Sequence, residues 1–368
     1  MNFLFLHYSR FATAPWRDGS TRYRCYHLAE ALQELGHLAD VAPLEHVDLK
    51  QLDCYDVVSV LRPQASRKLG RLIKHCKRLG IHLVADVDDL IFDEALAGIS
   101  PSVINGQAAE AVIEHRFRNN AHTLQDFDEI TVSTKAIADA WQQMKNNVPV
   151  TVVANGLSKK WLHAADLNLV HQGGKNDDRF RITYLPGTHS HDRDFESVID
   201  VMASTLKRHS IAELLIVGKL NFSQNKIPED RLIRASWMDY HYLPNVIASS
   251  DVTLAPLEDT PFTRAKSHIK FIESTAFDTP VICSPNEDIT RHTTPGLLVA
   301  ETKSDWLAAI ESLINKHTNN RELSTTEHSK QTMLRDYARK HCLARSSASA
   351  LLTHWSDIGL EQAFSHAA

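Results

Sequence analysis

Five polar side chains lie between two apolar runs, VTLAPL and PVICS, in the second half of the chain: Arg264, Lys266, Ser267, Lys270 and Glu273. We expect a helix here that carries the cations in its first turn. Unpaired backbone N–H groups and a positive partial charge at a helix N-terminus suit a phosphate. Glu273, further along the same helix, would accept hydrogen bonds from the two hydroxyls of a ribose. Cations for a diphosphate and a carboxylate for a sugar together indicate a nucleotide-sugar site.

An ordinary strand–helix–strand unit with a solvated, charged helix face would show the same residues. The place of the segment, after a buried strand of a predicted parallel sheet, favours a ligand site, because ligands bind at the carboxyl ends of such strands. Gly187 and Thr188 follow another predicted strand, where a glycine lets backbone N–H groups approach a phosphate closely. His191, just beyond them, is either a phosphate contact or part of a helix start.

Length and composition limit the classes of protein to consider. The chain has 368 residues, of which 43% are hydrophobic and 23% charged, which is typical of a globular protein with about two domains. The net charge of −5 gives no basic field for nucleic acid. The five cysteines form no CxxC pair, and the N-terminal apolar run is too short for a signal peptide. No run is long enough to span a membrane, so we expect a cytoplasmic protein.

Apolar runs that read as strands alternate with amphipathic segments, which predicts an α/β fold with parallel sheets. One series of such units covers residues 1–165, and a second covers 179–345. The polar stretch Leu157–Asp178 between them reads as a linker. Two doubly wound domains facing a cleft are therefore expected, with single helices predicted near 193–208 and 333–355.

Asp86, Asp88 and Asp89 follow the predicted strand IHLVA. Clustered carboxylates are costly unless they bind something or are hydrogen-bonded, so Asp88 or Asp89 could serve an acceptor hydroxyl as hydrogen-bond acceptor or general base. Alternatively, Asp86 and Asp89 cap the next helix. The same residues also spell DxD, a metal-binding signature of single-Rossmann (GT-A) glycosyltransferases.

Two further features lie in the first half of the chain. Gly19, in the turn Asp18–Ser20, would let the backbone approach a bound sugar, and Arg22 and Arg24 after it either meet an anion or form a solvated first turn. The segment Arg67–Gly80 carries six Lys or Arg and no acid. It reads as a packed helix with a basic outer face, or as a surface that contacts an anionic membrane.

The order of several motifs resembles the GT-B glycosyltransferases, most closely the retaining family 4. The motifs are GSTRYRCYHLAEALQELGH, EITVSTKAIADAW, VTVVANGLSKKW, ITYLPGTHSHDRDF and YLPNVIASSDVTLAPL. The resemblance implies two Rossmann-like domains, a nucleotide-sugar donor, and a last helix, within 346–368, that crosses back to the N-terminal domain. The family commonly carries two glutamates around the donor sugar. Glu273 matches the second, which implies the ribose role, but Ala265 stands at the first position, so the sugar-side carboxylate does not carry over.

The expected activity is transfer of a sugar from a nucleotide diphosphate sugar to a hydroxyl of a glycan or lipid-linked glycan. Lys270, Lys266 and Arg264, assisted by Ser267, would stabilise the negative charge that grows on the leaving diphosphate. The resemblance implies retention of configuration at the anomeric carbon. No metal or other cofactor is expected, because the basic residues neutralise the diphosphate. A nucleotide-sugar epimerase and a non-catalytic scaffold of the same fold remain as alternatives.

Overall fold

The computed structural model describes residues 1–166, 178–187, 191–322 and 333–360, without the side chains of 320–322. The chain divides into two compact units. The first comprises Met1–Ser158, Arg264–Ser267 and Leu343–Ala368, and the second comprises Lys159–Thr263 and His268–Cys342. By its contacts, the short segment Arg264–Ser267 therefore belongs to the first unit.

The first unit contains a six-stranded parallel sheet in the order β2-β1-β3-β4-β5-β6. Its strands are β1 (Asn2–His7), β2 (Leu38–Pro43), β3 (Val57–Leu61), β4 (His82–Val87), β5 (Glu129–Val132) and β6 (Val150–Val152). Its helices are α1 (Gly19–Thr21), α2 (His27–Glu34), α3 (Arg67–Leu79), α4 (Pro101–Ile104), α5 (Glu110–Leu124), α6 (Lys135–Gln143) and α16 (Ala344–Asp357). The strand order reverses between β1 and β3, and such a switch point is where ligands bind in open α/β sheets.

The second unit contains another six-stranded parallel sheet, in the order β12-β11-β10-β7-β8-β9. Its strands are β7 (Phe180–Gly187), β8 (Ala212–Gly218), β9 (Leu232–Ala235), β10 (Val252–Ala255), β11 (Val281–Cys283) and β12 (Leu297–Val299). Its helices are α7 (Lys159–Asp166), α8 (Asp192–Glu196), α9 (Ile199–Arg208), α10 (Leu243–Ala248), α11 (Pro261–Arg264), α12 (Ile269–Thr275), α13 (Glu287–Thr290), α14 (Lys303–Glu322) and α15 (Met333–His341). The switch point here lies between β7 and β10.

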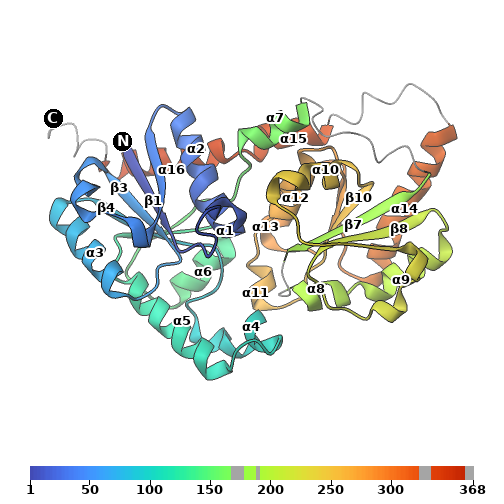
Figure 1. Cartoon of the computed structure of the whole chain (residues 1–368), viewed down its shortest axis with the longest axis horizontal. Coiled ribbons are helices and arrows are strands. Elements are labelled where there is room, and N and C mark those ends of the chain that lie inside the picture. The colour runs from blue at the N-terminus through green and yellow to red at the C-terminus, as the bar shows by residue number, and fades with distance from the viewer. Residues whose placement is uncertain (167–177, 188–190, 323–332, 361–368) are drawn as a thin grey trace. The chain divides into compact units, whose positions relative to one another are not determined.

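Helices lie on both faces of each sheet (Figure 1), which is why the strands read as continuous apolar runs. The prediction of two doubly wound α/β domains is confirmed. Three local predictions were wrong. The predicted helix 193–208 is two helices, α8 and α9, and the segment 333–355 breaks at Leu343 between α15 and α16. The predicted linker begins as α7, whose Trp161 is buried; residues 167–177 lie outside the described part of the chain.

The last helix, α16, completes the core of the first unit. Trp355 stacks on Phe3 of β1 at a centroid distance of 5.3 Å. Its indole N–H donates a 2.9 Å hydrogen bond to Glu129 of β5, a buried carboxylate that also pairs with His354 at 2.8 Å. Since the amphipathic pattern of α16 buries this face, the helix is held by both packing and polar contacts.

The chain leaves the first unit after Ser158, contributes Arg264–Ser267 to it, and returns to it finally at Leu343. The first exit and the final return adjoin. Leu157 and Leu343 form an isolated parallel β-bridge, and the N–H of Ala344 donates a 2.9 Å hydrogen bond to the carbonyl of Leu157. Gly156 permits the close crossing, since a Cβ there would lie 2.4 Å from the backbone nitrogen of Ala344.

Candidate functional site

The carboxyl ends of the strands in the first unit bring together several polar residues. His7 ends β1, Arg62 follows β3, and Asp88 and Asp89 follow β4. β3 pairs with both β1 and β4, so these side chains share one edge of the sheet, at the switch point.

Asp88 is committed to an ion pair. Nε of Arg62 donates to Oδ1 of Asp88 at 2.5 Å, and the carboxylate is nearly buried. Burial raises the pKa of Asp88, but the charge and hydrogen bond of Arg62, with a hydrogen bond from Ser20, outweigh it and leave the pKa below its ordinary value. A carboxylate with a lowered pKa is a poor general base, which argues against that role for Asp88.

Asp89 is placed differently. Its Oδ1 accepts a 3.1 Å hydrogen bond from the N–H of Leu90, while Oδ2 lies 3.9 Å from Nη2 of Arg62 and 3.8 Å from Nζ of Lys266. The carboxylate is about a quarter exposed. The prediction that Asp86 and Asp89 cap the next helix was wrong. Asp93 caps the next helical turn, and Asp86 pairs with Arg24.

Asp86 forms a buried ion pair with Arg24. Nε and Nη2 of Arg24 donate to the two carboxylate oxygens at 2.8 and 2.7 Å, and Thr131 adds a third hydrogen bond. Arg24 lies in a π-helical turn, Arg22–Tyr26, and both Arg22 and Arg24 are buried. The prediction that these arginines meet an anionic ligand or solvent was therefore wrong for Arg24, whose partner is 62 residues away in sequence.

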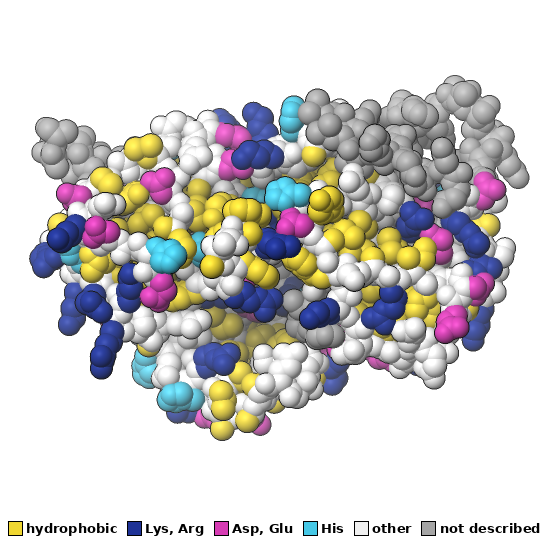
Figure 2. Space-filling model, viewed as in Figure 1, with side chains coloured by type: hydrophobic (Ala, Val, Ile, Leu, Met, Phe, Trp, Pro, Cys, Tyr) yellow, Lys and Arg dark blue, Asp and Glu magenta, His cyan; other side chains and the backbone are white. Residues whose placement is uncertain are grey.

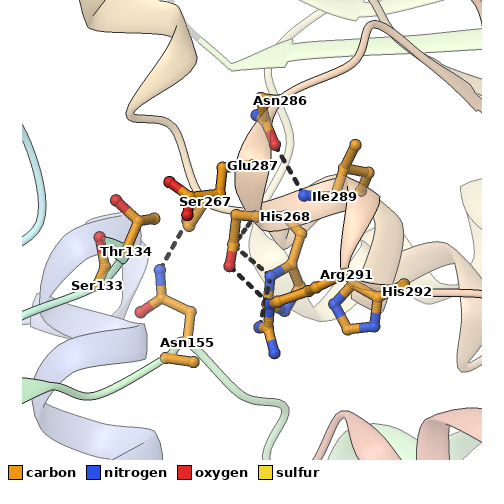
Figure 3. A network of polar contacts seen from close by, with 12 residues as sticks. Ser133, Thr134, Asn155, Ser267, His268, Asn286, Glu287, Ile289, Arg291 and His292 are labelled. Atoms are coloured by element: carbon orange, nitrogen blue, oxygen red, sulfur yellow. Dashed lines mark hydrogen bonds and ion pairs between the residues drawn. The ribbon is translucent and has the colours of Figure 1, made fainter. Parts of the chain in front are cut away.

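From Arg24 the hydrogen bonds continue to the segment 264–267. Nη1 of Arg24 donates to the amide oxygen of Asn155 at 3.0 Å, and the amide nitrogen of Asn155 donates to the hydroxyl of Ser267 at 2.8 Å (Figure 3). Thr134 adds a second anchor, since its hydroxyl donates to the carbonyl of Ala265 at 3.0 Å. The segment that carries Lys266 and Ser267 is thus fixed at two positions.

The prediction that Arg264, Lys266 and Ser267 begin the helix of Glu273 was wrong. Arg264 ends α11, Lys266 and Ser267 lie in the connection, and α12 begins at Ile269. His268, the residue just before α12, is buried. Lys270 does lie in the first turn of α12, one turn before Glu273.

In the second unit, His191 contacts a buried carboxylate, and the charge of Lys270 also acts on it. Nδ1 of His191 lies 2.7 Å from Oδ2 of buried Asp194, whose Oδ1 accepts a 2.9 Å hydrogen bond from the N–H of Glu258. Burial raises the pKa of Asp194, but His191, the N–H of Glu258 and the charge of Lys270 leave it below its ordinary value. Asp194 therefore joins α8, the loop after β10 and α12 at the switch point of the second sheet.

Glu273 is buried in α12, and its carbonyl accepts a 3.3 Å hydrogen bond from the indole of Trp161 in α7. Gly187 ends β7 with φ of +73°, a backbone conformation that favours glycine, and it is exposed. Gly19 is exposed in α1, which Asp18 caps through the N–H of Thr21. Thr188 lies outside the described residues.

A polar cluster around His268 was not predicted from the sequence. Asp288 of α13 accepts hydrogen bonds from the backbone N–H and the ring of His268, and Oδ1 also accepts a 2.8 Å hydrogen bond from Arg291. Burial raises the pKa of Asp288, but its hydrogen bonds and the charges around it lower it to about 2. Figure 3 shows His292 beside this group, and burial lowers the pKa of His292 to about 3. The cluster fixes the N-terminal end of α12 against α13.

The described residues contain no group of three or more His, Cys, Asp or Glu placed to hold a metal ion. Among the same residues, no helix has the length and apolar character that a bilayer crossing requires. α3 has the predicted bounds, and its apolar residues Leu69, Leu72, Ile73 and Cys76 are buried. Figure 2 shows Lys and Arg side chains gathered over α3.

Comparisons with known proteins agree on the class. Residues 179–316 match the family described as "Glycosyl transferases group 1". The fold resembles HepE of Anabaena, solved with UDP (13% identity, TM-score 0.62, 97% of this chain and 100% of that chain). It also resembles sucrose-phosphate synthase from Thermosynechococcus elongatus (13% identity, TM-score 0.60, 97% of this chain and 99% of that chain). A glycosyltransferase from Rickettsia africae is similar as well (12% identity, TM-score 0.57, 97% of this chain and 98% of that chain). No curated protein matches the chain by sequence.

Proposed function

We propose a donor, an acceptor class and a chemical course for this chain, which is a glycosyltransferase with the GT-B fold. The chain transfers a sugar from a nucleotide diphosphate sugar to a hydroxyl of a glycan or lipid-linked glycan, in the synthesis of a polysaccharide or surface glycan. The observation that carries this proposal is the contact of His191 with buried Asp194, on which the charge of Lys270 also acts, at the switch point of the unit that matches the glycosyltransferase family.

The donor binds to the second unit in this proposal. The backbone at Gly187 approaches the diphosphate, His191 and Lys270 contact it, and Glu273 accepts hydrogen bonds from the ribose. The exposed, left-handed Gly187 supports the first contact, because it leaves the backbone open to an anion. HepE has been solved with UDP, with UDP and glucose, and with UDP-glucose, so uridine diphosphate sugars are the first donors to test.

The chemical step breaks the bond between the anomeric carbon and the β-phosphate oxygen, whose electron pair stays on the phosphate. The acceptor oxygen forms the new bond on the same face, and its proton passes to the departing phosphate. Lys270, with Lys266 and Arg264, stabilises the charge that develops there, assisted by the hydroxyl of Ser267. Asp89 accepts a hydrogen bond from the acceptor hydroxyl, and Asp88 positions Arg62. No metal ion is required in this proposal.

Calorimetric binding of UDP, GDP, dTDP and ADP, each with and without EDTA, tests the donor site. Binding of one nucleotide that is insensitive to EDTA and lost in Glu273→Ala supports the proposal, provided that the exposed control Lys303→Ala binds normally. Binding that needs a divalent cation and survives in Glu273→Ala would move the site to the aspartates after β4. No binding of any nucleotide would favour a scaffold, and product analysis that finds epimerised donor without transfer would favour an epimerase.

A membrane contact through α3 completes the proposal, and with it a cytoplasmic location on the inner face of the membrane. The helix carries six cations: Arg67, Lys68, Arg71, Lys74, Lys77 and Arg78. None has a carboxylate partner among the described residues, so their charges remain available to anionic lipid.

Sedimentation with vesicles tests this contact. We expect binding to vesicles that contain phosphatidylglycerol, weaker binding at high salt, and loss of binding in the triple variant Lys74→Glu, Lys77→Glu, Arg78→Glu. The matched control is Lys207→Glu, Lys303→Glu, Lys316→Glu, which changes the net charge equally on exposed residues of the second unit. Equal loss in both variants would show that net charge, and not α3, governs the binding.

A further inference from the structure

Arg62 has an unusual backbone conformation at the switch point of the first sheet. Its φ is +47°, in the left-handed region, although it is not a glycine and precedes Pro63. A residue before proline is normally extended, so this conformation persists only because its surroundings fix it. One such constraint is the 2.7 Å hydrogen bond from the N–H of Arg62 to the carbonyl of Asp86.

The side chain of Arg62 is held at one of its nitrogens. Nε donates to Asp88, and burial of Asp88 makes that pair firm. The terminal nitrogens form no hydrogen bond with any described residue, and the side chain is about one third exposed. Asp88 thus orients a guanidinium whose outer edge remains available to a ligand.

Asp89 lies near two cations without a hydrogen bond to either. The distances from Oδ2 of Asp89, 3.9 Å to Nη2 of Arg62 and 3.8 Å to Nζ of Lys266, are too long for hydrogen bonds. A ligand oxygen can therefore bridge Asp89 to one of these cations. A hydroxyl can donate to Asp89 while it accepts from a cation. A carboxylate or a fully ionised phosphate monoester has no proton to give Asp89.

A second observation points to a polar ligand at this edge. His7, at the end of β1, is 1% exposed, and its Nδ1 accepts a 3.1 Å hydrogen bond from the N–H of Ser9. Nε2 therefore carries the proton in the neutral ring, and within the described residues it has no hydrogen-bond partner. β1 pairs with β3, so His7 at the end of β1 and Arg62 after β3 lie at the same edge of the sheet.

We infer that Arg62, Asp89 and Lys266 bind a hydroxyl group of a neutral sugar, and that Arg62 determines the specificity of the acceptor site. The acceptor that this site selects is an uncharged glycosyl unit, and not a phosphorylated or uronic acid sugar at the reacting end. This inference rests on the proposed function and narrows its acceptor class. It assigns Asp88 the role of a positioning residue that acts through Arg62.

Saturation-transfer NMR on the whole protein with UDP tests the inference, with methyl glucoside, methyl galactoside and methyl mannoside as probes. We expect a saturation-transfer signal from at least one glycoside. This signal should fall roughly tenfold in Arg62→Lys, which keeps the positive charge but loses the several N–H donors of the guanidinium. The double variant Arg62→Met, Asp88→Asn leaves no unpaired buried charge and should show the same loss. The control Arg181→Lys alters an arginine of the second unit that is ion-paired with Glu213 at 2.7 Å.

The inference fails if no glycoside responds, if Arg62→Lys responds like the wild type, or if inorganic phosphate at constant ionic strength displaces the glycoside. Calorimetry on the same samples separates this failure from failure of the proposed function. UDP that binds with no Arg62-dependent sugar response rejects the acceptor site alone, whereas absence of UDP binding rejects the donor site.

Discussion

Asn155 and Ser267 are joined by a 2.8 Å hydrogen bond, although 112 residues separate them in sequence. Asn155 follows β6, and Ser267 lies in the connection before α12. Because Asn155 also accepts from the buried Arg24, the connection that carries Lys266 is tied to the interior of the first unit.

Ser267→Ala removes this tie and leaves the buried amide of Asn155 without its partner. We expect the free energy of unfolding to fall by about 1–3 kcal/mol, since an unsatisfied buried donor costs that much. Scanning calorimetry measures the change, with the exposed Ser349→Ala as control. Equal stability of both variants would mean that water replaces the lost bond.

Arg24→Met should be among the most destabilising single changes in the first unit. The substitution leaves Asp86 as a buried charge without its ion-pair partner, and breaking a buried ion pair costs about 3–5 kcal/mol. The double variant Arg24→Met, Asp86→Leu should recover part of the loss, because both charges are gone. Arg193→Ala, which breaks the exposed pair with Glu258, should cost at most about 1 kcal/mol. Denaturant unfolding compares the three, and a double variant no more stable than Arg24→Met would contradict the argument.

Asp288 should make the free energy of unfolding fall at low pH. Its pKa is about 2 in the folded chain against an ordinary value of 3.8, so its contribution is complete above pH 3.8 and is lost as the pH falls through 2. The difference corresponds to about 2 kcal/mol. Thermal unfolding at pH 7 and pH 3 should show a smaller acid loss in Asp288→Asn than in the wild type. Identical acid losses would exclude Asp288 as the source.

Asp88→Asn and Asp89→Asn should have different kinetic effects. Asp88 holds Arg62, so its loss should raise the KM for acceptor by about tenfold with a smaller effect on kcat. Asp89→Asn should lower kcat by about tenfold or more, because a neutral amide oxygen accepts a weaker hydrogen bond from the acceptor hydroxyl than a carboxylate does. Steady-state kinetics at saturating donor separates the two. Asp88 would be the base instead if Asp88→Asn abolished kcat together with the acidic limb of its pH profile.

Lys270→Ala should lower kcat by about 10²–10³, the usual effect of removing one group that stabilises developing charge. Magnesium should not restore the rate, and EDTA should not affect the wild type. The exposed Lys303→Ala is the matched control. Rescue by magnesium would show that a metal ion can neutralise the diphosphate in this site.

The sequence was sufficient to predict both sheets. Apolar runs such as VTLAPL and PVICS became β10 and β11, because strands of a parallel sheet are buried on both faces and need no alternation. The GT-B fold was also predicted from the order of the motifs and is confirmed, and residues 179–316 match a family of glycosyl transferases. The closer resemblance to family 4 remains a prediction, as do the roles of the individual site residues.

Several polar partners could not be predicted, because they join residues far apart in the chain, as Arg24 and Asp86 do. From the sequence, Arg24 was either an anion contact or part of a solvated first turn, and only the fold brings Asp86 to it. His191 was either a phosphate contact or part of a helix start, and its contact with buried Asp194 was not predicted. Arg62 did carry a signal, an arginine before proline at a strand end, but its left-handed backbone depends on contacts with β4.

The crossing of Leu157 and Leu343 has a consequence for how the protein can be rebuilt. Because these residues adjoin, both ends of the chain between them emerge from the first unit at one point. A short peptide from residue 158 to residue 343 would join the two remaining parts of the first unit, but it would also remove Arg264–Ser267 and their hydrogen bonds to Asn155 and Thr134. A graft of the corresponding stretch from another protein at this junction would therefore replace Lys266, beside Asp89, together with the second unit.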